Sequence, residues 1–248
     1  MTLISRTKIE YGDYIFNPVI GCLRKCPYCW ARGFARRFAK IIANKEYRFK
    51  NNIVSMDGIL LELAPLINQL KHFKPTFLEH NFAKEFPKKP SMILVGFMTD
   101  INYWEKEWMK RVLDKIKQYQ QHKFVFLSKE PLVTFDYIFP YNCILGYTIT
   151  DKLNRNIVRD FCRNRSNKTL LNIEPMHNKF VKIDLKLMKY FDWIVVGAET
   201  GNCLSKIIPK REWIESIVNQ ARQYNIPIFL KDNLKEIWGG KLIQEKIK

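Results

Sequence analysis

Short apolar runs, rich in β-branched and aromatic residues, alternate with longer polar or amphipathic segments from about residue 90 onward. Each run is short enough for a strand and almost continuously apolar, which is the pattern of strands buried on both faces of a parallel sheet. A similar run lies near the N-terminus. The pattern predicts seven strands, at 14–20, 92–98, 123–128, 143–149, 169–174, 192–198 and 226–230.

The segments between these strands place apolar residues at helical spacing. Strand, helix and strand in this rhythm form a βαβ repeat, which is typical of α/β folds. A less regular insertion occupies about 44–90, and no inter-domain linker is visible. We therefore expect one α/β domain over 1–248, a partial (β/α) barrel of six or seven parallel strands. The helices predicted are 28–43, 58–70, 105–121 and 210–224.

Polar side chains follow six consecutive predicted strands. In barrels of this type the working residues lie at the carboxyl ends of the strands. Any loop tends to begin with polar residues, so one such residue carries little weight, but the recurrence predicts a single polar pocket at the barrel mouth. The residues are Thr99, Asp100, Ser128, Lys129, Thr148, Thr150, Glu174, Glu199, Thr200, Lys231 and Asp232.

Length and hydrophobic composition indicate which broad class of protein the chain belongs to. The chain has 248 residues, 47% of them hydrophobic, which is enough apolar material for one large core. No apolar run approaches the roughly 20 residues that cross a bilayer, and the N-terminus is too polar for a secretory signal. We expect no membrane association and a cytoplasmic location.

The chain is strongly basic. Lysine and arginine number 42 against 24 acidic residues, a net charge of +18. Such a field attracts polyanions, and nucleic acid is the usual one. A codon-composition bias toward lysine is the other explanation, so charge alone leaves both open.

Three of the six cysteines lie within eight residues, in the stretch "GCLRKCPYCW", with the spacing C-x3-C-x2-C. In an intracellular chain a tight cluster favours a metal or an iron-sulfur site over a disulfide framework. The other three stand alone and are expected to be ordinary core thiols. The cluster is Cys22, Cys26 and Cys29, and the isolated residues are Cys143, Cys162 and Cys203.

Two metal sites are compatible with three thiolates. A structural zinc site normally has four ligands, as two close pairs, and no second Cys or His pair is present; His72, His80, His122 and His177 are scattered. A Cys3His zinc site is therefore the alternative. Three thiolates on a [4Fe-4S] cluster leave one iron open to a small molecule carrying an amine and a carboxylate.

The cysteine stretch resembles that of the radical S-adenosylmethionine (SAM) superfamily, in which C-x3-C-x2-C, with an aromatic residue such as Tyr28 before the last cysteine, follows the first barrel strand. The rest of the chain is similar to the phage Gp37/Gp68-like family. Its segments are matched in order, from residue 7 to about residue 234, by "TKIEYGDYIFNPVIGC", "VGFMTDI", "FLSKEP", "LGYTITD", "LLNIEPM", "DWIVVGAETG" and "REWIESIVNQARQYNIPIFLKDNL". A local similarity to spore photoproduct lyase covers the Thr-Asp and Ser-Lys pairs after the second and third strands.

The resemblance implies a radical SAM barrel and a cofactor pair. Cys22, Cys26 and Cys29 would hold a [4Fe-4S] cluster whose open iron binds SAM. One electron, from a donor such as flavodoxin or ferredoxin, would cleave SAM to methionine and a 5'-deoxyadenosyl radical that abstracts hydrogen from the substrate.

Roles for the rim residues follow from their chemistry in that context. A carboxylate and a hydroxyl suit the methionine ammonium, a lysine suits its carboxylate, and hydroxyls suit the ribose. The two glutamates fit ribose, substrate or an ion-pair network with the lysines. A thiol near the mouth fits return of hydrogen to a product radical, or is an incidental small residue. The ammonium would be bound by Thr99 and Asp100, the carboxylate by Lys129 or Lys231, and the ribose by Ser128, Thr148 and Thr150. The two glutamates are Glu174 and Glu199, and the thiol is that of Cys203.

A basic stripe follows the cysteines. Arg32, Arg36 and Lys40 are four residues apart on one helical face, with Arg37 adjoining. This stripe is either a phosphate-binding surface or a solvated helix face.

The leading prediction is a radical SAM enzyme acting on nucleic acid or a nucleotide-like substrate, in modification or repair. The alternatives are a non-catalytic, zinc-stapled nucleic-acid-binding module and a radical SAM enzyme for a peptide or small metabolite.

Overall fold

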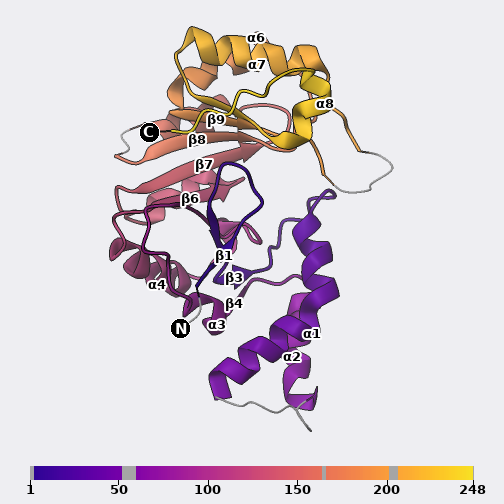
Figure 1. The fold of residues 1–248 in the computed structure, drawn as a ribbon, viewed down its shortest axis with the longest axis vertical. Helices are drawn as coiled ribbons and strands as arrows, with labels where there is room; N and C mark the ends of the chain where they lie inside the picture. Colours follow the sequence, from indigo (N-terminus) through magenta and orange to yellow (C-terminus); the bar gives the residue numbers. More distant parts are fainter. Residues whose placement is uncertain (1–2, 52–59, 164–165, 201–205, 248) are drawn as a thin grey trace.

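A computed structural model of the chain describes residues 3–51, 60–163, 166–200 and 206–247. It is an α/β fold on an eight-stranded sheet, in the order β1-β2-β5-β6-β7-β8-β9-β10 (Figure 1). Within this sheet the described strands from β2 through β5 to β10 run parallel to one another, and β1 pairs antiparallel with β2. The bounds are β1 Ser5–Arg6, β2 Tyr14–Phe16, β5 Met92–Val95, β6 Lys123–Ser128, β7 Cys143–Ile149, β8 Lys168–Ile173, β9 Trp193–Val196 and β10 Ile228–Leu230.

The seven predicted strands therefore form one parallel sheet in sequence order. Among the described strands no pairing joins β10 to β1 or β2, so the sheet is open and compatible with a partial barrel. The first predicted strand, 14–20, was wrong in its length. The structure divides it into β2 and β3 (Val19–Ile20), and β3 pairs with β4 (Thr76–Phe77) in a separate sheet. Pro18 lies at the break, and proline has no amide hydrogen for a ladder.

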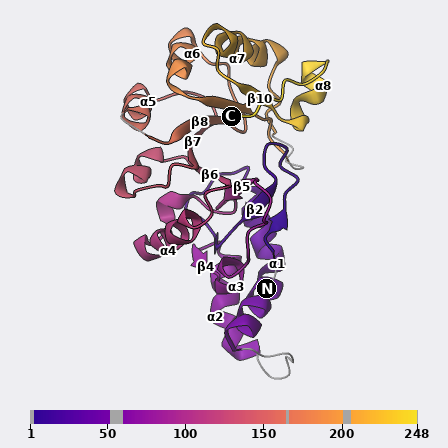
Figure 2. The ribbon, with the colours of Figure 1, turned by 60° about the vertical axis from the view of Figure 1, so that its left-hand side comes forward.

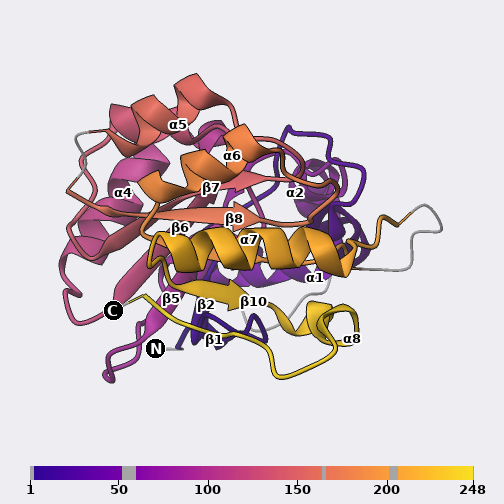
Figure 3. The same ribbon diagram turned by 90° about the horizontal axis from the view of Figure 1, so that it is seen from above.

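Helices cover one face of the large sheet (Figures 2 and 3). In α4 the residues Met109, Val112, Leu113 and Ile116 recur at helical spacing and are buried against the strands. None of the described helices combines the length and the apolar character needed to cross a membrane. The helices are α4 Lys106–Lys117, α5 Arg155–Cys162, α6 Lys182–Leu187, α7 Arg211–Gln223 and α8 Lys235–Trp238, with short 3-10 helices η1 Ile101–Tyr103, η2 Pro131–Asp136, η3 Met188–Tyr190 and η4 Asp232–Leu234.

Both faces of the sheet are buried, as the continuous apolar runs predicted. Ile93 and Val95 of β5 belong to the core beneath the helices, while Met92 and Leu94 belong to a second core on the opposite face. That second core is completed by Tyr11, from the connection between β1 and β2, whose ring contacts strands β9 and β10 at Trp193 and Phe229.

The last residues of the chain run antiparallel along β10. Gln244 forms a bridge with Phe229, and the amide of Leu230 donates to the carbonyl of Ile243 at 2.8 Å. The indole of Trp193 donates to the carbonyl of Glu245 at 2.9 Å. The outer edge of β10 is therefore covered by the C-terminal segment.

A pair of helices, the second of them within the predicted insertion, projects away from the sheet (Figure 1). The first, α1, spans Trp30–Asn51, so the predicted helix 28–43 was too short, and it packs against α2, Leu60–Lys71. Their contact is built on small residues of α1, Ala35 and Ala39 among them, which allow close approach of the two helices. A short helix, α3 (Glu79–Phe82), follows β4.

A buried carboxylate fixes α1 to α3. Glu46 accepts hydrogen bonds from the amide of Glu79 at 2.9 Å and from the amide and ring nitrogen of His80 at 3.0 and 2.8 Å. Burial alone would raise the pKa of Glu46. The hydrogen bonds from His80, from the amides and from Lys50 outweigh burial and lower that pKa to about 2.

Glu46→Gln is expected to reduce the free energy of unfolding at pH 7 by about 2 kcal/mol, because the ionised carboxylate is the better acceptor for these donors. Since the folded-state pKa lies below the unfolded value, this stabilisation is present above about pH 4.5 and is lost as the pH falls toward 2. Urea unfolding at pH 7 and pH 3 measures it, with the exposed Glu107→Gln as control. An equal loss at both pH values would contradict the prediction.

Candidate functional site

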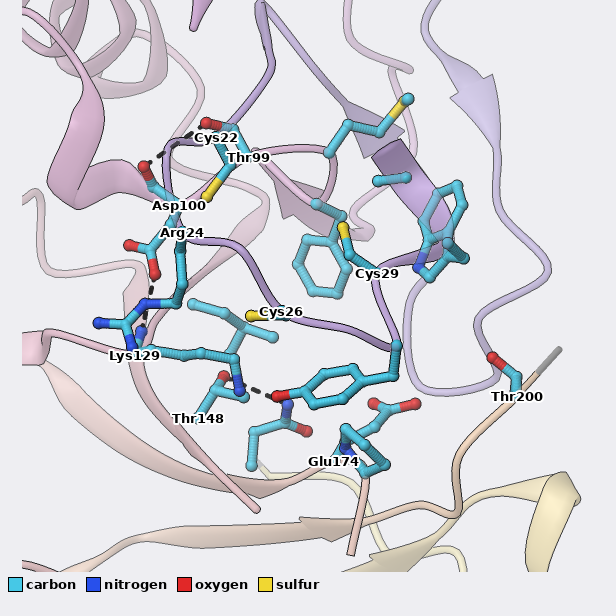
Figure 4. A pocket seen from close by; sticks show the side chains of 18 of the residues that line it. Cys22, Arg24, Cys26, Cys29, Thr99, Asp100, Lys129, Thr148, Glu174 and Thr200 are labelled. Atoms are coloured by element: carbon cyan, nitrogen blue, oxygen red, sulfur yellow. Dashed lines mark hydrogen bonds between the residues drawn. The ribbon is translucent and has the colours of Figure 1, made fainter. Parts of the chain in front are cut away.

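A cavity of about 390 Å³ opens at the carboxyl ends of the parallel strands, beneath the cysteine loop (Figure 4). All three clustered cysteines line it, and so do eight of the nine rim residues predicted to bind cofactor. The structure thus gathers into one pocket residues that are more than 200 positions apart in the sequence. The eight rim residues are Thr99, Asp100, Ser128, Lys129, Thr148, Glu174, Glu199 and Lys231.

Thr150 is the predicted rim residue that does not line this cavity. Strand β7 ends at Ile149, so Thr150 belongs to the following loop and lines a neighbouring cavity of about 810 Å³. Its carbonyl accepts a hydrogen bond from the amide of His177 at 2.7 Å. The two cavities share walls at Arg24, Tyr28 and Lys129.

Gly21 places the cysteine loop. It has φ of +108°, and a Cβ at this position would lie 2.1 Å from the carbonyl oxygen of Lys74. Its amide donates to the carbonyl of Met98 at 3.0 Å, and the next amide, of Cys22, donates to the carbonyl of Phe73 at 2.8 Å. Only glycine permits this approach of the loop to the insertion.

Arg32 also holds the cysteine loop. Its guanidinium donates to the carbonyl of Arg24 at 3.0 Å and lies over the ring of Phe73 at 5.1 Å. It is half-buried, whereas Arg36, Arg37 and Lys40, the other members of the basic stripe, are exposed on α1. The stripe predicted to bind phosphate therefore contains one residue engaged with the protein's own backbone.

The cysteines are half-buried thiols with cationic neighbours. Burial is the main cause that raises the pKa of Cys22 to about 11, with Asp100 and the other two cysteines adding to it and the amide of Arg24 opposing it. Burial also lowers the pKa of Lys129, whose ammonium lies over the Tyr28 ring at 5.5 Å. Without a bound cation, Cys22 is thus a neutral thiol at pH 7.

Asp100 joins the ends of two neighbouring strands. Its carboxylate accepts hydrogen bonds from the Ser128 hydroxyl at 2.6 Å, the Lys129 amide at 3.0 Å and the Asn102 amide at 3.1 Å. The hydroxyl of Thr99 accepts from the indole of Trp104 at 3.2 Å. These residues line the cavity, but much of their hydrogen-bonding capacity is used to build its wall.

An ion pair crosses the mouth between the ends of β8 and β10. Lys231 is buried, and its ammonium contacts the carboxylate of Glu174. Gly197, at the end of the intervening β9, leaves room for this pair, because a Cβ there would lie 2.9 Å from Lys231 Cδ and 3.1 Å from Glu174 Oε1. Of the roles expected for Glu174, the ion pair with a lysine is the one that the structure contains.

Two residues of the site were missed from the sequence. The His177 ring nitrogen Nε2 lies 3.0 Å from Glu199 Oε2, and the ring packs edge-on against Tyr28 with centroids 5.1 Å apart. His177 therefore links the Glu199 carboxylate to the cysteine loop, a contact without a local sequence signal.

Asn172 is the second residue of the site that was missed. It is buried, donates to the Thr148 hydroxyl at 3.3 Å and has no partner for Oδ1 among the described residues. A polar residue inside the apolar run "TLLNIE" was the available signal for it.

The isolated cysteines lie apart from the cluster. Cys143 is the first residue of β7 and is buried, at the opposite end of the strand from the cavity. Cys162 is the last residue of α5, and Cys203 lies outside the described residues, so its predicted role stays a prediction.

The donor set at the cavity fits an iron-sulfur cluster. Three thiols of one short loop line one cavity, with the cationic Lys129 beside them to offset the negative charge that thiolates bring. Among the described residues, no group of three or more His, Cys, Asp or Glu side chains is arranged to hold a single metal ion.

The comparison with known families covers nearly the whole chain. Residues 6–245 match the model of a family described as a protein of unknown function (DUF5131). No curated protein matches the chain.

Proposed function

Since the chain belongs to the DUF5131 family, whose description names no activity, we propose its function from the site: a radical SAM enzyme with a [4Fe-4S] cluster on Cys22, Cys26 and Cys29. The observation that carries the proposal is that these three thiols share one cavity with the polar ends of six parallel strands. When bound, the cluster would pass one electron to the sulfonium of SAM and so generate a 5'-deoxyadenosyl radical.

The two lysines that line the cavity differ in whether a carboxylate of the described residues is paired with them. Lys231 contacts Glu174, whereas Lys129 has no carboxylate within ion-pair distance in the described part of the chain. The half-buried ammonium of Lys129 would therefore bind the carboxylate of the methionine moiety. Lys231 and Glu174 would instead hold the mouth of the cavity in shape.

The part of the cavity around Asn172 suits the adenosine moiety. Asn172 offers an unpaired carbonyl oxygen, which would accept a hydrogen bond from a ribose hydroxyl or an exocyclic amine. Apolar side chains line the space beside it, Phe97 and Leu127 among them. They would exclude water from the reacting groups, which a radical reaction requires.

The proposed substrate is nucleic acid or nucleotide-like, and the electron donor a flavodoxin or ferredoxin. The net charge of +18 supports a polyanionic substrate. The neighbouring cavity supports it as well, because its lining has more cations than carboxylates: Arg24, Lys25, Lys129, Lys152 and Arg155 against Glu130 and Asp151.

Anaerobic reconstitution of the full chain with iron and sulfide tests the proposal. The expected result is a brown protein with about four iron and four sulfide per chain, which forms 5'-deoxyadenosine and methionine from SAM after reduction, as measured by mass spectrometry. Protein that holds one zinc and no iron would establish the zinc-stapled alternative instead. SAM cleavage without affinity for any nucleic acid would favour a peptide or small metabolite.

A further inference from the structure

The helix that follows the cysteines carries an exposed aromatic stripe. Trp30, Phe34, Phe38 and Ile41 recur at intervals of four, four and three residues, so they lie on one side of α1. Trp30 is 52% exposed, Phe34 43% and Ile41 52%, and Phe38 is half-buried. The rings form a continuous row, with centroids 6.3 Å apart for the first pair and 4.6 Å for the second. An exposed row of this kind marks a binding surface more often than a scattered apolar residue does.

The stripe extends from the candidate active site to a second cavity. Trp30 lines the cavity that contains the cysteines. Phe34, Phe38 and Ile41 line another cavity, of about 440 Å³, whose far wall comes from β1 and β2. We call the stripe together with this cavity the aromatic groove. Helix α1 runs from the cysteine loop toward the projecting end of the helix pair (Figure 1), and the stripe follows it from Trp30 to Ile41.

The aromatic groove is cationic. Lys45 and Lys84 line it, and no carboxylate is among the described residues that do so. Burial and the nearby Lys45 both lower the pKa of Lys84, so the two ammonium groups repel each other without an anion between them. Arg37 and Arg48 lie on the same side of α1 as the stripe by their spacing.

We propose that the aromatic groove binds single-stranded nucleic acid, whose bases stack on Trp30, Phe34 and Phe38 and whose phosphates contact Lys45 and Lys84. Stacked rings flanked by cations are the combination that holds single strands, since every base offers a π-face and every nucleotide a charge. The stretch from Trp30 to Ile41 spans about 16 Å, enough for about three to five nucleotides. The strand would pass from the groove into the cavity, which places one nucleotide beside the cysteines.

The alternatives to this occupant are less consistent with the lining. An apolar peptide would cover the rings but bring no negative charge to the two lysines, one of which, Lys84, donates within the described part of the chain only to the neutral Asn81 at 2.9 Å. A second copy of this strongly basic chain would bring further positive charge to the same surface. The inference rests on the proposed function for the chemistry that follows binding, but not for binding itself.

Fluorescence anisotropy of the full chain with a labelled single-stranded decamer, of DNA and of RNA, tests it. Phe34→Ala is expected to weaken binding about tenfold, because stacking contributes on the order of 1 to 3 kcal/mol per base. Phe34→Tyr keeps the ring and should bind as the parent does, whereas Phe34→Leu keeps the apolar surface and should lose affinity like alanine. Lys45→Ala with Lys84→Ala should reduce the slope of log K against log salt by about 1.4.

Matched controls come from the rest of the surface. Tyr141→Ala removes an aromatic residue that is 67% exposed, and Lys106→Ala with Lys117→Ala removes two exposed cations of α4. These variants should keep the parent affinity, and thermal unfolding checks that all variants are folded.

Three results would overturn the inference: unchanged affinity for Phe34→Ala, equal losses in the controls, or equal binding of duplex and single strand. A change of oligomeric state in Phe34→Ala without loss of nucleic-acid binding would assign the stripe to self-association instead. Since binding is measured without SAM, a protein that binds the decamer but forms no 5'-deoxyadenosine would refute the proposed function alone.

Discussion

Replacing Cys26 by alanine is expected to abolish cluster assembly and SAM cleavage, with at least a hundredfold loss of 5'-deoxyadenosine formation. A [4Fe-4S] cluster with three protein ligands has none to spare, and two thiolates would leave two irons open to solvent. Cys26 lies in the middle of the loop and lines both cavities. Burial raises the pKa of the nearby Tyr28 hydroxyl, and the Cys26 thiol adds to this effect.

The measurement is iron and sulfide content after anaerobic reconstitution, followed by the SAM cleavage assay. Cys162→Ala is the matched control, because it removes one half-buried thiol from the end of α5, outside the cavity. It should keep the parent iron content and activity. A Cys26→Ala protein with the full complement of iron, or a Cys162→Ala protein without it, would exclude the assigned ligand set. Circular dichroism shows whether either variant has lost its fold.

The second large effect is expected for Gly21→Ala, which should lower the free energy of unfolding by at least about 3 kcal/mol. Backbone strain at positive φ contributes about 1 to 3 kcal/mol. The added methyl group also collides with the carbonyl of Lys74, a backbone atom that cannot rotate away. Relief of the clash would separate Cys22 from Phe73 and displace the first cysteine, so iron binding should fall together with stability.

Gly33→Ala provides the comparison for this prediction. Gly33 lies in α1, and a Cβ there would meet no atom within 4 Å. Alanine is the better helix former by about 1 kcal/mol, so this variant should be as stable as the parent or more so. Urea unfolding of both variants gives the two free energies. If Gly21→Ala unfolds like Gly33→Ala, the loop does not need the left-handed glycine.

The positions of the strands could be predicted because their chemistry is local, whereas their order in the sheet comes from the structure. Runs such as 143–149 are apolar throughout, and a strand buried on both faces needs no other information to be recognised. The polar residues after each run mark the strand ends, which is why eight of nine predicted rim residues share a cavity. Thr150 was the exception: β7 ends at Ile149, as predicted, but the sequence does not show that the next loop residue lines the neighbouring cavity.

Other features depend on contacts between distant segments. The length of α1 follows from its packing on α2 and from the bond between Glu46 and α3, since the polar segment "NKEYRFKN" alone has little helical periodicity. His177 joins the site through Glu199 and Tyr28, residues more than 20 positions away in either direction. A sequence pattern read within a short stretch of the chain cannot show a contact between residues so far apart.

The two outer edges of the sheet have a consequence for how molecules of this protein meet one another. An open parallel sheet exposes unpaired backbone groups at both ends, which invite strands of neighbouring molecules to add to them. Here each edge carries a short antiparallel segment: β1 on β2, and the C-terminal segment on β10. Each molecule thereby covers the sheet edges to which strands of other molecules could add. Removal of the residues after about 240 would expose the edge of β10, so it should promote ordered aggregation even where the cavity remains intact.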